Sequence, residues 1–194
     1  MPRKPDPHLE ERILRAAQKL YLKGGEKALS MRTLAKTART NTPAVYRRFK
    51  NRKEILNALL RRIQQDLAVV LKPCVSLDEV ARRFVEFMLQ HPHEYQLANS
   101  GLYSKVGTDR PNLDLIRERC AEWLGGSVDD YTNLVLTAWA LSHGTAMLLI
   151  SQAVPAVYEG RLRTALTETI ELLVRNERQS DAQGVFSQQV SGKT

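Results

Sequence analysis

The stretch SMRTLAKTARTNTPAVYRRF, residues 30–49, decides the fold that this sequence predicts. Ser30 is a good N-cap for a short helix with one apolar face, and four polar residues follow that helix. A second short helix is expected over about 42–49, where Val45 and Phe49 lie one turn apart. Two short helices joined by a turn of three or four residues have the spacing of a helix-turn-helix.

Pro43 stands where the second helix is expected to begin. Proline is favoured at the first helical position because the N–H that it lacks would have no helical partner there. Either Asn41 or Thr42 can serve as the N-cap, and the sequence does not decide between them. A helix that begins abruptly here is expected to present Thr42, Pro43 and Ala44 outward.

The second helix of such a motif enters the major groove, and the first helix crosses the DNA backbone. Val45 and Phe49 are expected to face the core, and Tyr46 lies where its hydroxyl can reach a phosphate. Arg47 and Arg48 project toward DNA or solvent. The N-termini of the neighbouring helices offer further donors to phosphates, from Ser30, Thr33, Arg52 and Lys53.

Positive charge is concentrated in the first third of the chain. Residues 1–65 contain 17 Lys and Arg but only 5 Asp and Glu, whereas residues 66–194 contain 12 and 16. A basic segment attached to a mildly acidic remainder indicates a polyanion-binding module on a separate body. Charge alone equally permits a solvated basic face without a partner.

Apolar residues recur at helical spacing almost throughout, and no strand pattern is evident. The sequence therefore predicts an all-α protein of nine helices. Capping patterns mark three of the helix starts, at Asn51 with Glu54, Ser76 with Glu79, and Ser127 with Asp130. The helices are expected over about 8–23, 31–38, 42–49, 52–71, 77–90, 92–101, 113–124, 128–153 and 157–177.

The segment ILRAAQKLYLKGGEKALSMRTLAKTARTNTPAVYRRFKNRKEIL, residues 13–56, resembles the DNA-binding domain of TetR-type bacterial transcriptional regulators. The paired alanines, the paired glycines and the positions of Tyr46, Phe49 and Lys53 agree in register. The family usually has glycine where this chain has Arg39 and Pro43. The resemblance implies a DNA-binding domain over 1–52 and a ligand-binding and dimerisation domain over 53–178. The tail over 179–194 is rich in Ser, Gln and Gly, has few apolar residues and is expected to be disordered.

The resemblance also implies roles for residues of the interface. Phosphate contacts would fall to Thr33, Tyr46, Arg48 and Lys53, and base-edge contacts to Asn41, Thr42, Ala44 and Arg47. Arg47 could donate to guanine, and a good bidentate contact is worth about 1–3 kcal/mol of discrimination. The full expected interface comprises Ser30, Thr33, Arg39, Thr40, Asn41, Thr42, Pro43, Ala44, Tyr46, Arg47, Arg48 and Lys53.

The helices expected over 128–153 and 157–177 are the candidates for a dimer interface. The resemblance implies that they pair with their mates in a four-helix bundle, so that a homodimer binds a double-stranded, palindromic operator. AWALSHG, residues 138–144, resembles the Trp…His-Gly signature of one C-terminal subclass. Trp139 and His143 could line a ligand pocket, or could stack in the core with Gly144 allowing close helix approach.

A small apolar or amphipathic effector is the expected ligand, although a helical core needs the same residue types. The pocket candidates are Phe84, Phe87, Met88, Tyr95, Leu102, Tyr103, Trp123, Trp139, His143 and Met147. No cofactor or metal is expected, because His91, Pro92 and His93 lack the spacing of metal ligands. No catalytic motif is present, so an enzyme is not expected.

Cys74 and Cys120 are expected to be buried thiols of a cytoplasmic protein, and no secretion signal or membrane span is expected. The leading hypothesis is a ligand-responsive repressor that releases its operator when an effector binds. The alternative is an architectural protein that binds DNA with little sequence preference and has no effector.

Overall fold

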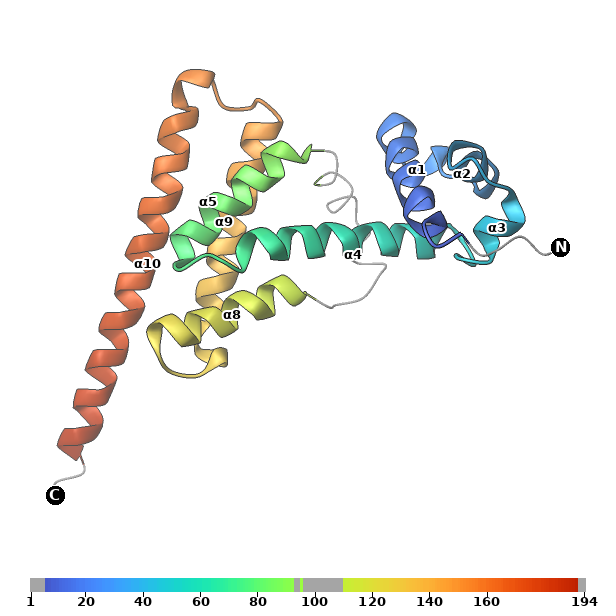
Figure 1. Cartoon of the computed structure of the whole chain (residues 1–194). Coiled ribbons are helices and arrows are strands. Elements are labelled where there is room, and N and C mark those ends of the chain that lie inside the picture. Colours follow the sequence, from blue (N-terminus) through green and yellow to red (C-terminus); the bar gives the residue numbers. More distant parts are fainter. Residues whose placement is uncertain (1–5, 93–94, 96–109, 192–194) are drawn as a thin grey trace. The chain divides into compact units, whose positions relative to one another are not determined.

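The computed structural model describes residues 6–92, 95 and 110–191, with side chains as far as Gln179. Within these residues the chain forms eight α-helices and two short 3-10 helices and no strand (Figure 1). The predicted all-α class is therefore confirmed. The helix predicted over 92–101 lies outside the described residues except for Pro92 and Tyr95.

The chain divides into two compact units, and the division falls within one helix, after Gln65. We call described residues 6–65 the headpiece, and residues 66–92 with 110–191 the body. The sequence-based expectation placed this boundary earlier, at 52–53, where the same helix begins.

The headpiece contains one 16-residue helix, two short helices with side-chain N-caps, and the start of a further long helix. Its elements are α1 (Leu9–Gly24), η1 (Gly25–Ala28), α2 (Met31–Thr37), α3 (Thr42–Tyr46) and the first part of α4 (Arg52–Leu71). α2 packs against both α1 and α3. The core is contributed by every one of these α-helices, through Ile13, Ala17, Leu34, Val45 and Ile55, all fully buried. Gly25 ends α1 with φ 61°, a left-handed conformation that glycine adopts without strain.

The body is a helical bundle. Beyond the end of α4 it contains α5 (Leu77–Gln90), α8 (Pro111–Leu124), η3 (Val128–Tyr131), α9 (Thr132–Ile150) and α10 (Ala156–Ser191). α5 packs against both α9 and α10, α9 packs against α10, and α8 packs against α9. The buried side chains Val85, Cys120, Leu134 and Ile170 show that all four of these helices contribute to its core.

Polar caps fix the starts of α5 and η3, at the two serines where the sequence predicts caps in the body. Glu79 N donates to Ser76 Oγ over 3.4 Å, and Glu79 Oε2 accepts from Val75 N over 3.0 Å. Ser127 and Asp130 form a capping box, but it opens the 3-10 helix η3. α9 therefore begins only at Thr132, later than expected.

α10 is longer than the helix that the sequence predicts. It continues to Ser191, through the segment expected to be a disordered tail from residue 179. Residues 179–191 contain one glycine and no proline, so the backbone there can continue the hydrogen bonds of the helix despite the polar composition. Residues 192–194 lie outside the described part of the chain.

One helical stretch, Val128–Ile150, is long and apolar enough to cross a membrane by length and composition, with a mean hydropathy of 1.4. A single stretch of this kind is weak evidence for a membrane span, because the core helix of a soluble protein meets the same criteria.

Candidate nucleic-acid interface

The start of α2 is fixed by a reciprocal capping box. Thr33 N donates to Ser30 Oγ, and Ser30 N donates to Thr33 Oγ1, each over 3.0 Å. Thr33 Oγ1 is also within 3.0 Å of the carbonyl oxygen of Ala28. Both hydroxyl groups are exposed, so the capping geometry leaves them at the surface where the first helix of the motif begins.

The turn after α2 closes with two hydrogen bonds. Arg39 N donates to Lys36 O over 3.2 Å, and Thr40 N donates to Ala35 O over 2.9 Å, which is the pattern of a Schellman motif. The motif requires a left-handed residue, and Arg39 occupies that position with φ 52°. A non-glycine residue costs about 1 kcal/mol or more in this conformation. Glycine adopts this conformation without that cost, which explains why related proteins usually have glycine where this chain has Arg39.

The start of α3 settles the choice of N-cap. Asn41 is the cap, because its Oδ1 accepts a hydrogen bond from Ala44 N over 2.8 Å. Thr42 is then the first helical residue and Pro43 the second, one position later than the sequence suggests. Proline is still tolerated there, because the first four N–H groups of a helix have no helical acceptor.

α3 is shorter than expected and ends at Tyr46, so Arg47 and Arg48 lie in the following turn. Val45 and Phe49 are buried, which confirms that they face the core. The expectation that Ala44 points outward is wrong, because Ala44 is only 4% exposed. In so short a helix packed on α2, both Ala44 and Val45 are covered.

The other expected contact residues are accessible. Tyr46 is 53% exposed. Thr40 and Thr42 are half-buried. The remaining members of the expected interface are exposed, namely Ser30, Thr33, Arg39, Asn41, Pro43, Arg47, Arg48 and Lys53. The fold therefore keeps this expected set at the surface of the headpiece, apart from Ala44.

The start of α4 is held by both a cap and an ion pair. Glu54 N donates to Asn51 Oδ1 over 3.0 Å, and Glu54 Oε2 accepts from Lys50 N over 2.7 Å. Arg52 pairs with Glu26 of η1 over 2.9 Å and also donates to the Glu26 carbonyl oxygen over 3.0 Å. This leaves Lys53 exposed beside a fixed helix N-terminus, as a phosphate contact would require.

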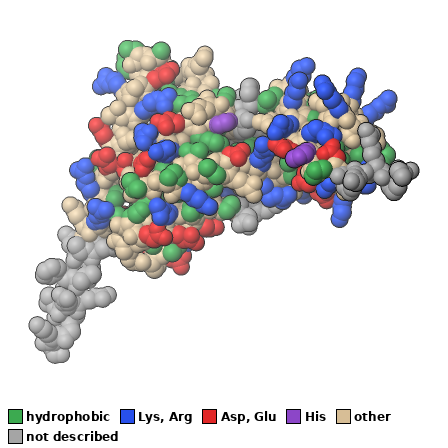
Figure 2. Space-filling view, viewed as in Figure 1, with side chains coloured by type: hydrophobic (Ala, Val, Ile, Leu, Met, Phe, Trp, Pro, Cys, Tyr) green, Lys and Arg blue, Asp and Glu red, His purple; other side chains and the backbone are tan. Residues whose placement is uncertain are grey.

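The headpiece surface is strongly basic. Between Glu26 and Glu54 the chain contains nine Lys and Arg residues and no Asp or Glu. Lys and Arg side chains gather over this part of the molecule in Figure 2. Within the described part of the chain, Lys36, Arg39, Arg47 and Lys53 take part in no ion pair. A surface with unneutralised cations attracts a polyanion.

Three of the five acidic residues of the headpiece, Asp6, Glu11 and Glu26, form ion pairs with arginines. Asp6 forms an ion pair with Arg12, and Glu11 forms one with Arg15. The hydrogen bond from Arg12 is the main cause that lowers the pKa of Asp6, followed by the one from the His8 backbone. The hydrogen bond from Arg15 likewise lowers the pKa of Glu11. These carboxylates therefore stay ionised and leave other cations free.

The predicted pocket residues do not form one group in the described structure. Phe84, Phe87 and Met88 are buried on α5, and Tyr95 is also buried. Leu102 and Tyr103 lie outside the described residues. Trp123 on α8 is half-buried, with the Arg119 guanidinium 5.3 Å from its ring centroid.

Trp139 and His143 are in contact, with ring centroids 5.7 Å apart. Neither sequence-based interpretation describes them fully, because Trp139 is 41% exposed and lies on the surface of α9. Burial lowers the pKa of His143. Met147 is exposed one turn further along, and a Cβ placed on Gly144 would meet no atom of this chain within 4 Å. Gly144 therefore serves no close helix approach within the described chain.

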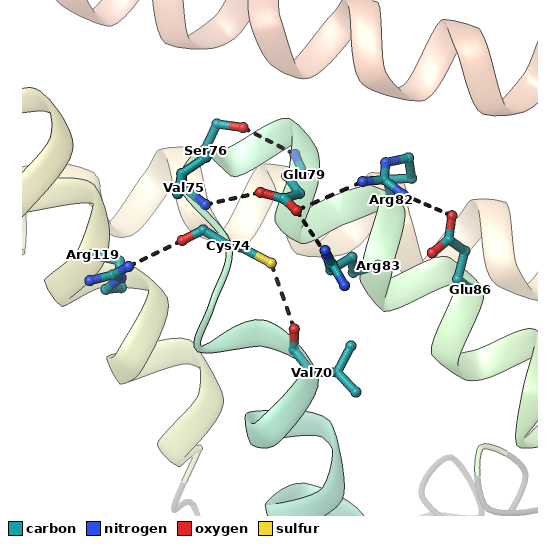
Figure 3. Close-up of polar contacts among 9 residues, drawn as sticks. All are labelled: Val70, Cys74, Val75, Ser76, Glu79, Arg82, Arg83, Glu86 and Arg119. Carbon is teal, nitrogen blue, oxygen red and sulfur yellow. Dashed lines mark hydrogen bonds and ion pairs between the residues drawn. The ribbon is translucent and has the colours of Figure 1, made fainter.

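Sequence reasoning missed a polar network at the junction of α4 and α5 (Figure 3). Arg119 of α8 donates to the Cys74 carbonyl oxygen over 3.1 Å. On the other side of Cys74, Glu79 binds both the Val75 N–H and, over 2.9 Å, Arg83 Nε. The Ser76–Glu79 cap was visible in the sequence, but nothing local indicated that Arg119, 45 residues away from Cys74, would join it.

The two cysteines are buried and unpaired, as expected. Burial raises the pKa of the Cys74 thiol, and it raises the pKa of Cys120 to about 12. Both thiols therefore stay protonated at neutral pH and behave as core residues. Within the described part of the chain, no group of three or more His, Cys, Asp or Glu residues could hold a metal ion.

A capped helix, a tight turn and a second capped helix, carried on a basic headpiece, define a helix-turn-helix protein. Residues 13–59 match the family model for bacterial regulatory proteins of the tetR family. Residues 77–173 match the model for the C-terminal domain of tetracyclin repressor-like proteins. The chain therefore belongs to the TetR family of bacterial transcriptional regulators, as its sequence predicts.

Solved structures share the fold. A tetR-family transcriptional regulator from Streptomyces coelicolor is 20% identical with a TM-score of 0.68, covering 97% of this chain and 90% of that one. A TetR-like regulator from Rhodococcus sp. RHA1 is 18% identical with a TM-score of 0.62, covering 89% and 96%. The multidrug binding protein EbrR, complexed with imidazole, is 23% identical with a TM-score of 0.62, covering 87% and 93%. No curated protein is detectably similar to the chain in sequence.

Proposed function

We propose that this DNA-binding regulator is a repressor, which binds a palindromic operator as a homodimer and releases it when a small molecule binds the body. The observation that supports a DNA-binding surface is the group of exposed cations without ion pairs around α3. Among the described residues, Arg47 and Lys53 are exposed cations without an ion pair, and Tyr46, next to Arg47 in sequence, is also exposed. Base reading falls to Asn41, Thr42 and Arg47.

Phosphate contacts fall to a second group of residues, which fix the register of α3 without reading sequence. Thr33 and Lys53 lie at the starts of α2 and α4, where the partial positive charge of a helix terminus favours a phosphate. Tyr46 and Arg48 lie at the end of α3 and just after it. Ala44 is left out of the proposed base readers because it is buried.

The homodimer is proposed to form through α9 and α10. α9 contains no Asp, Glu, Lys or Arg, yet large apolar side chains remain exposed along it. An uncharged helix with such a face needs a covering surface. The exposed members are Leu136, Trp139, Leu141, Met147 and Leu148 of α9, and Val157, Tyr158 and Leu172 of α10.

Two glycines support close approach by a second copy. A Cβ placed on Gly144 of α9 or on Gly160 of α10 would meet no atom of this chain within 4 Å. A partner backbone could therefore approach both helices closely. Because a twofold dimer presents the same patch from both subunits, α9 and α10 of each chain would together form a four-helix bundle.

The effector is proposed to be a small apolar or amphipathic molecule bound among the helices of the body. The support is the apolar and aromatic composition of α5 and α8, together with the description of EbrR as a multidrug binding protein. The effector would act by binding the DNA-free arrangement of the dimer more tightly than the DNA-bound one. The regulator would work in the cytoplasm, where its DNA target is.

Selection of bound DNA from a random pool tests the proposal. We expect one motif with twofold symmetry, and weaker binding to random DNA. Equal affinity for selected and random DNA would instead support an architectural protein without an effector. A recovered motif without twofold symmetry would contradict the homodimer.

Substitution of the phosphate contacts provides the second test. Lys53→Ala is expected to weaken binding to all DNA alike, and to reduce the slope of log affinity against log salt by about 1.8, because each of the two subunits loses one phosphate contact. Tyr46→Phe removes only the hydroxyl and should weaken binding without changing that slope. Lys72→Ala, a substitution of an exposed lysine in the body, is the charge-matched control. Unchanged affinity in both headpiece variants would contradict the proposed interface.

A further inference from the structure

A polar cluster in the headpiece connects three segments that sequence reasoning treated separately. Asp6 lies just before α1, Ala38 ends α2, and Arg48 follows α3. Arg12 of α1 joins the first two, because it pairs with the Asp6 carboxylate and donates from Nε to the Ala38 carbonyl oxygen over 3.3 Å. Arg48 Nη2 donates to the Asp6 carbonyl oxygen over 3.4 Å.

The Ala38 carbonyl lies at a demanding point of the backbone. Ala38 is the C-cap of α2, and the next residue is Arg39 in its left-handed conformation. Most proteins place glycine at such a position because other residues are strained there. The hydrogen bond from Arg12 to the Ala38 carbonyl therefore stabilises the turn next to its strained residue, Arg39.

Asp6 holds Arg12 in the orientation that this bond requires. One carboxylate oxygen accepts from Arg12, and the other accepts from the His8 N–H over 2.9 Å. The carboxylate is thus tied to the first turn of α1 while it pairs with the guanidinium. An arginine can present two N–H groups in a fixed planar arrangement, which a lysine cannot reproduce.

We propose that Arg12 and Asp6 are positioning residues of the DNA interface. Arg12 holds the turn between α2 and α3 in register, Asp6 orients Arg12, and neither side chain needs to touch DNA. The proposal rests on the proposed DNA-binding function of α3. It differs from a role in general stability, because it assigns the two residues to sequence discrimination.

The test compares Arg12→Lys with the wild-type chain, using the selected operator and a scrambled duplex of the same length. Lysine keeps the charge but loses the planar pair of donors. We expect the ratio of affinities for the two duplexes to fall about three- to tenfold, the worth of one hydrogen bond. The salt dependence of binding should not change. The matched control is Arg15→Lys, one turn further along α1, where the arginine pairs with Glu11. This variant should keep the wild-type affinity ratio and the wild-type salt dependence.

A slope reduced by about 1.8 in an Arg12→Ala variant would overturn the proposal, because it would show that Arg12 of each subunit itself binds a phosphate. Asp6→Asn provides an independent variant. It removes a negative charge from the headpiece, so affinity for scrambled DNA should rise while the affinity ratio falls. A general loss of folding would weaken binding to both duplexes, which contradicts the proposal.

A double-mutant cycle with Arg39→Gly tests the connection to the turn. Glycine removes the strain, so Arg12→Lys should reduce the affinity ratio by a smaller factor in the Arg39→Gly chain than in the wild type. Equal factors in both chains would overturn the role assigned to Arg12. If the wild-type chain selects no DNA sequence, the proposed function itself fails. If it selects one and Arg12→Lys leaves the ratio unchanged, only the positioning role fails.

Discussion

The headpiece and the body differ in the kind of side chain that they leave exposed without a partner. In the headpiece the large apolar side chains of α2 and α3 are covered, apart from Tyr46, and the surface carries cations without ion pairs. In the body the charged residues of α5 and α8 are largely paired, but α9 carries an exposed apolar face. The headpiece surface is therefore suited to a polyanion as its partner, whereas the exposed face of α9 is suited to an apolar one.

The two kinds of exposed surface, charged and apolar, have different energetic consequences in water. Unpaired charge is compatible with a soluble monomer because water and salt solvate it. An exposed apolar face is costly in water, and its burial against a second copy would stabilise the folded chain. Substitutions in the body should therefore change assembly, and those in the headpiece should change recognition.

The largest effect is expected from Leu148→Glu on α9, where the wild-type side chain is 41% exposed. A carboxylate in an apolar interface must lose its hydration without a partner, so the dimer should dissociate. Loss of the second headpiece should reduce operator affinity by about 100-fold or more. Light scattering measures the assembly state. Val69→Glu, at an exposed valine of α4, is the control, and a dimeric Leu148→Glu chain would contradict the proposed interface.

The next largest effect is expected from Arg47→Ala in the headpiece. Loss of a base contact should weaken operator binding about 5- to 150-fold, equivalent to 1–3 kcal/mol. The variant should remain dimeric, since Arg47 lies outside the body. Selection from a random pool should recover a motif that is relaxed at one position in each half-site. Equal weakening toward every sequence would instead assign Arg47 to a phosphate.

Arg39→Gly and Lys36→Gly should change stability in opposite directions. Glycine at Arg39 removes the strain of φ 52°, so the free energy of unfolding of the headpiece should rise by about 1 kcal/mol. Glycine at Lys36 lies inside α2 and should lower it by about 1 kcal/mol. Chemical denaturation measures both values. Destabilisation by Arg39→Gly would show that the left-handed turn is not the source of strain.

The smallest effect concerns the Asp6–Arg12 pair at low pH. Because the pKa of Asp6 is lowered in the folded chain, its stabilising effect is fully present above the unfolded value, near 3.8. The effect is lost as the pH falls through the lower folded pKa. An NMR titration of the Asp6 carboxyl should give a pKa below 3.8, and Arg12→Ala should raise it. An unshifted value in the wild-type chain would remove the ionic contribution to this pair.

Much of the headpiece could be predicted from local patterns. The caps at Ser30 and Asn51, like the cap at Ser76 in the body, are where their residue types predict, because capping depends on neighbours three residues away. The length of α3 was overestimated, since Arg47 and Arg48 are compatible with a helix but lie in the turn that brings Phe49 into the core. Packing, which no local pattern contains, also buried Ala44.

The candidate sites divide in the same way. The exposed cations of the DNA interface could be predicted because charge and turn chemistry are local. The predicted pocket residues could not be assigned, because Phe87 and Trp139 are equally apolar in sequence, yet one is in the core and the other is on the surface of α9. Contacts between distant segments, such as Arg12 with Ala38 and Arg119 with Cys74, likewise had no sequence signal.

By itself, the sequence determined the all-α class, the helix-turn-helix, its family and the basic surface, because helical periodicity, caps and charge are properties of neighbouring residues. Only the tertiary structure decided that Asn41 caps α3, that Ala44 is buried and that Arg39 is left-handed. It also decided which face of α9 remains uncovered. Those outcomes depend on how helices pack, and the free energy of packing comes from residues far apart in the chain.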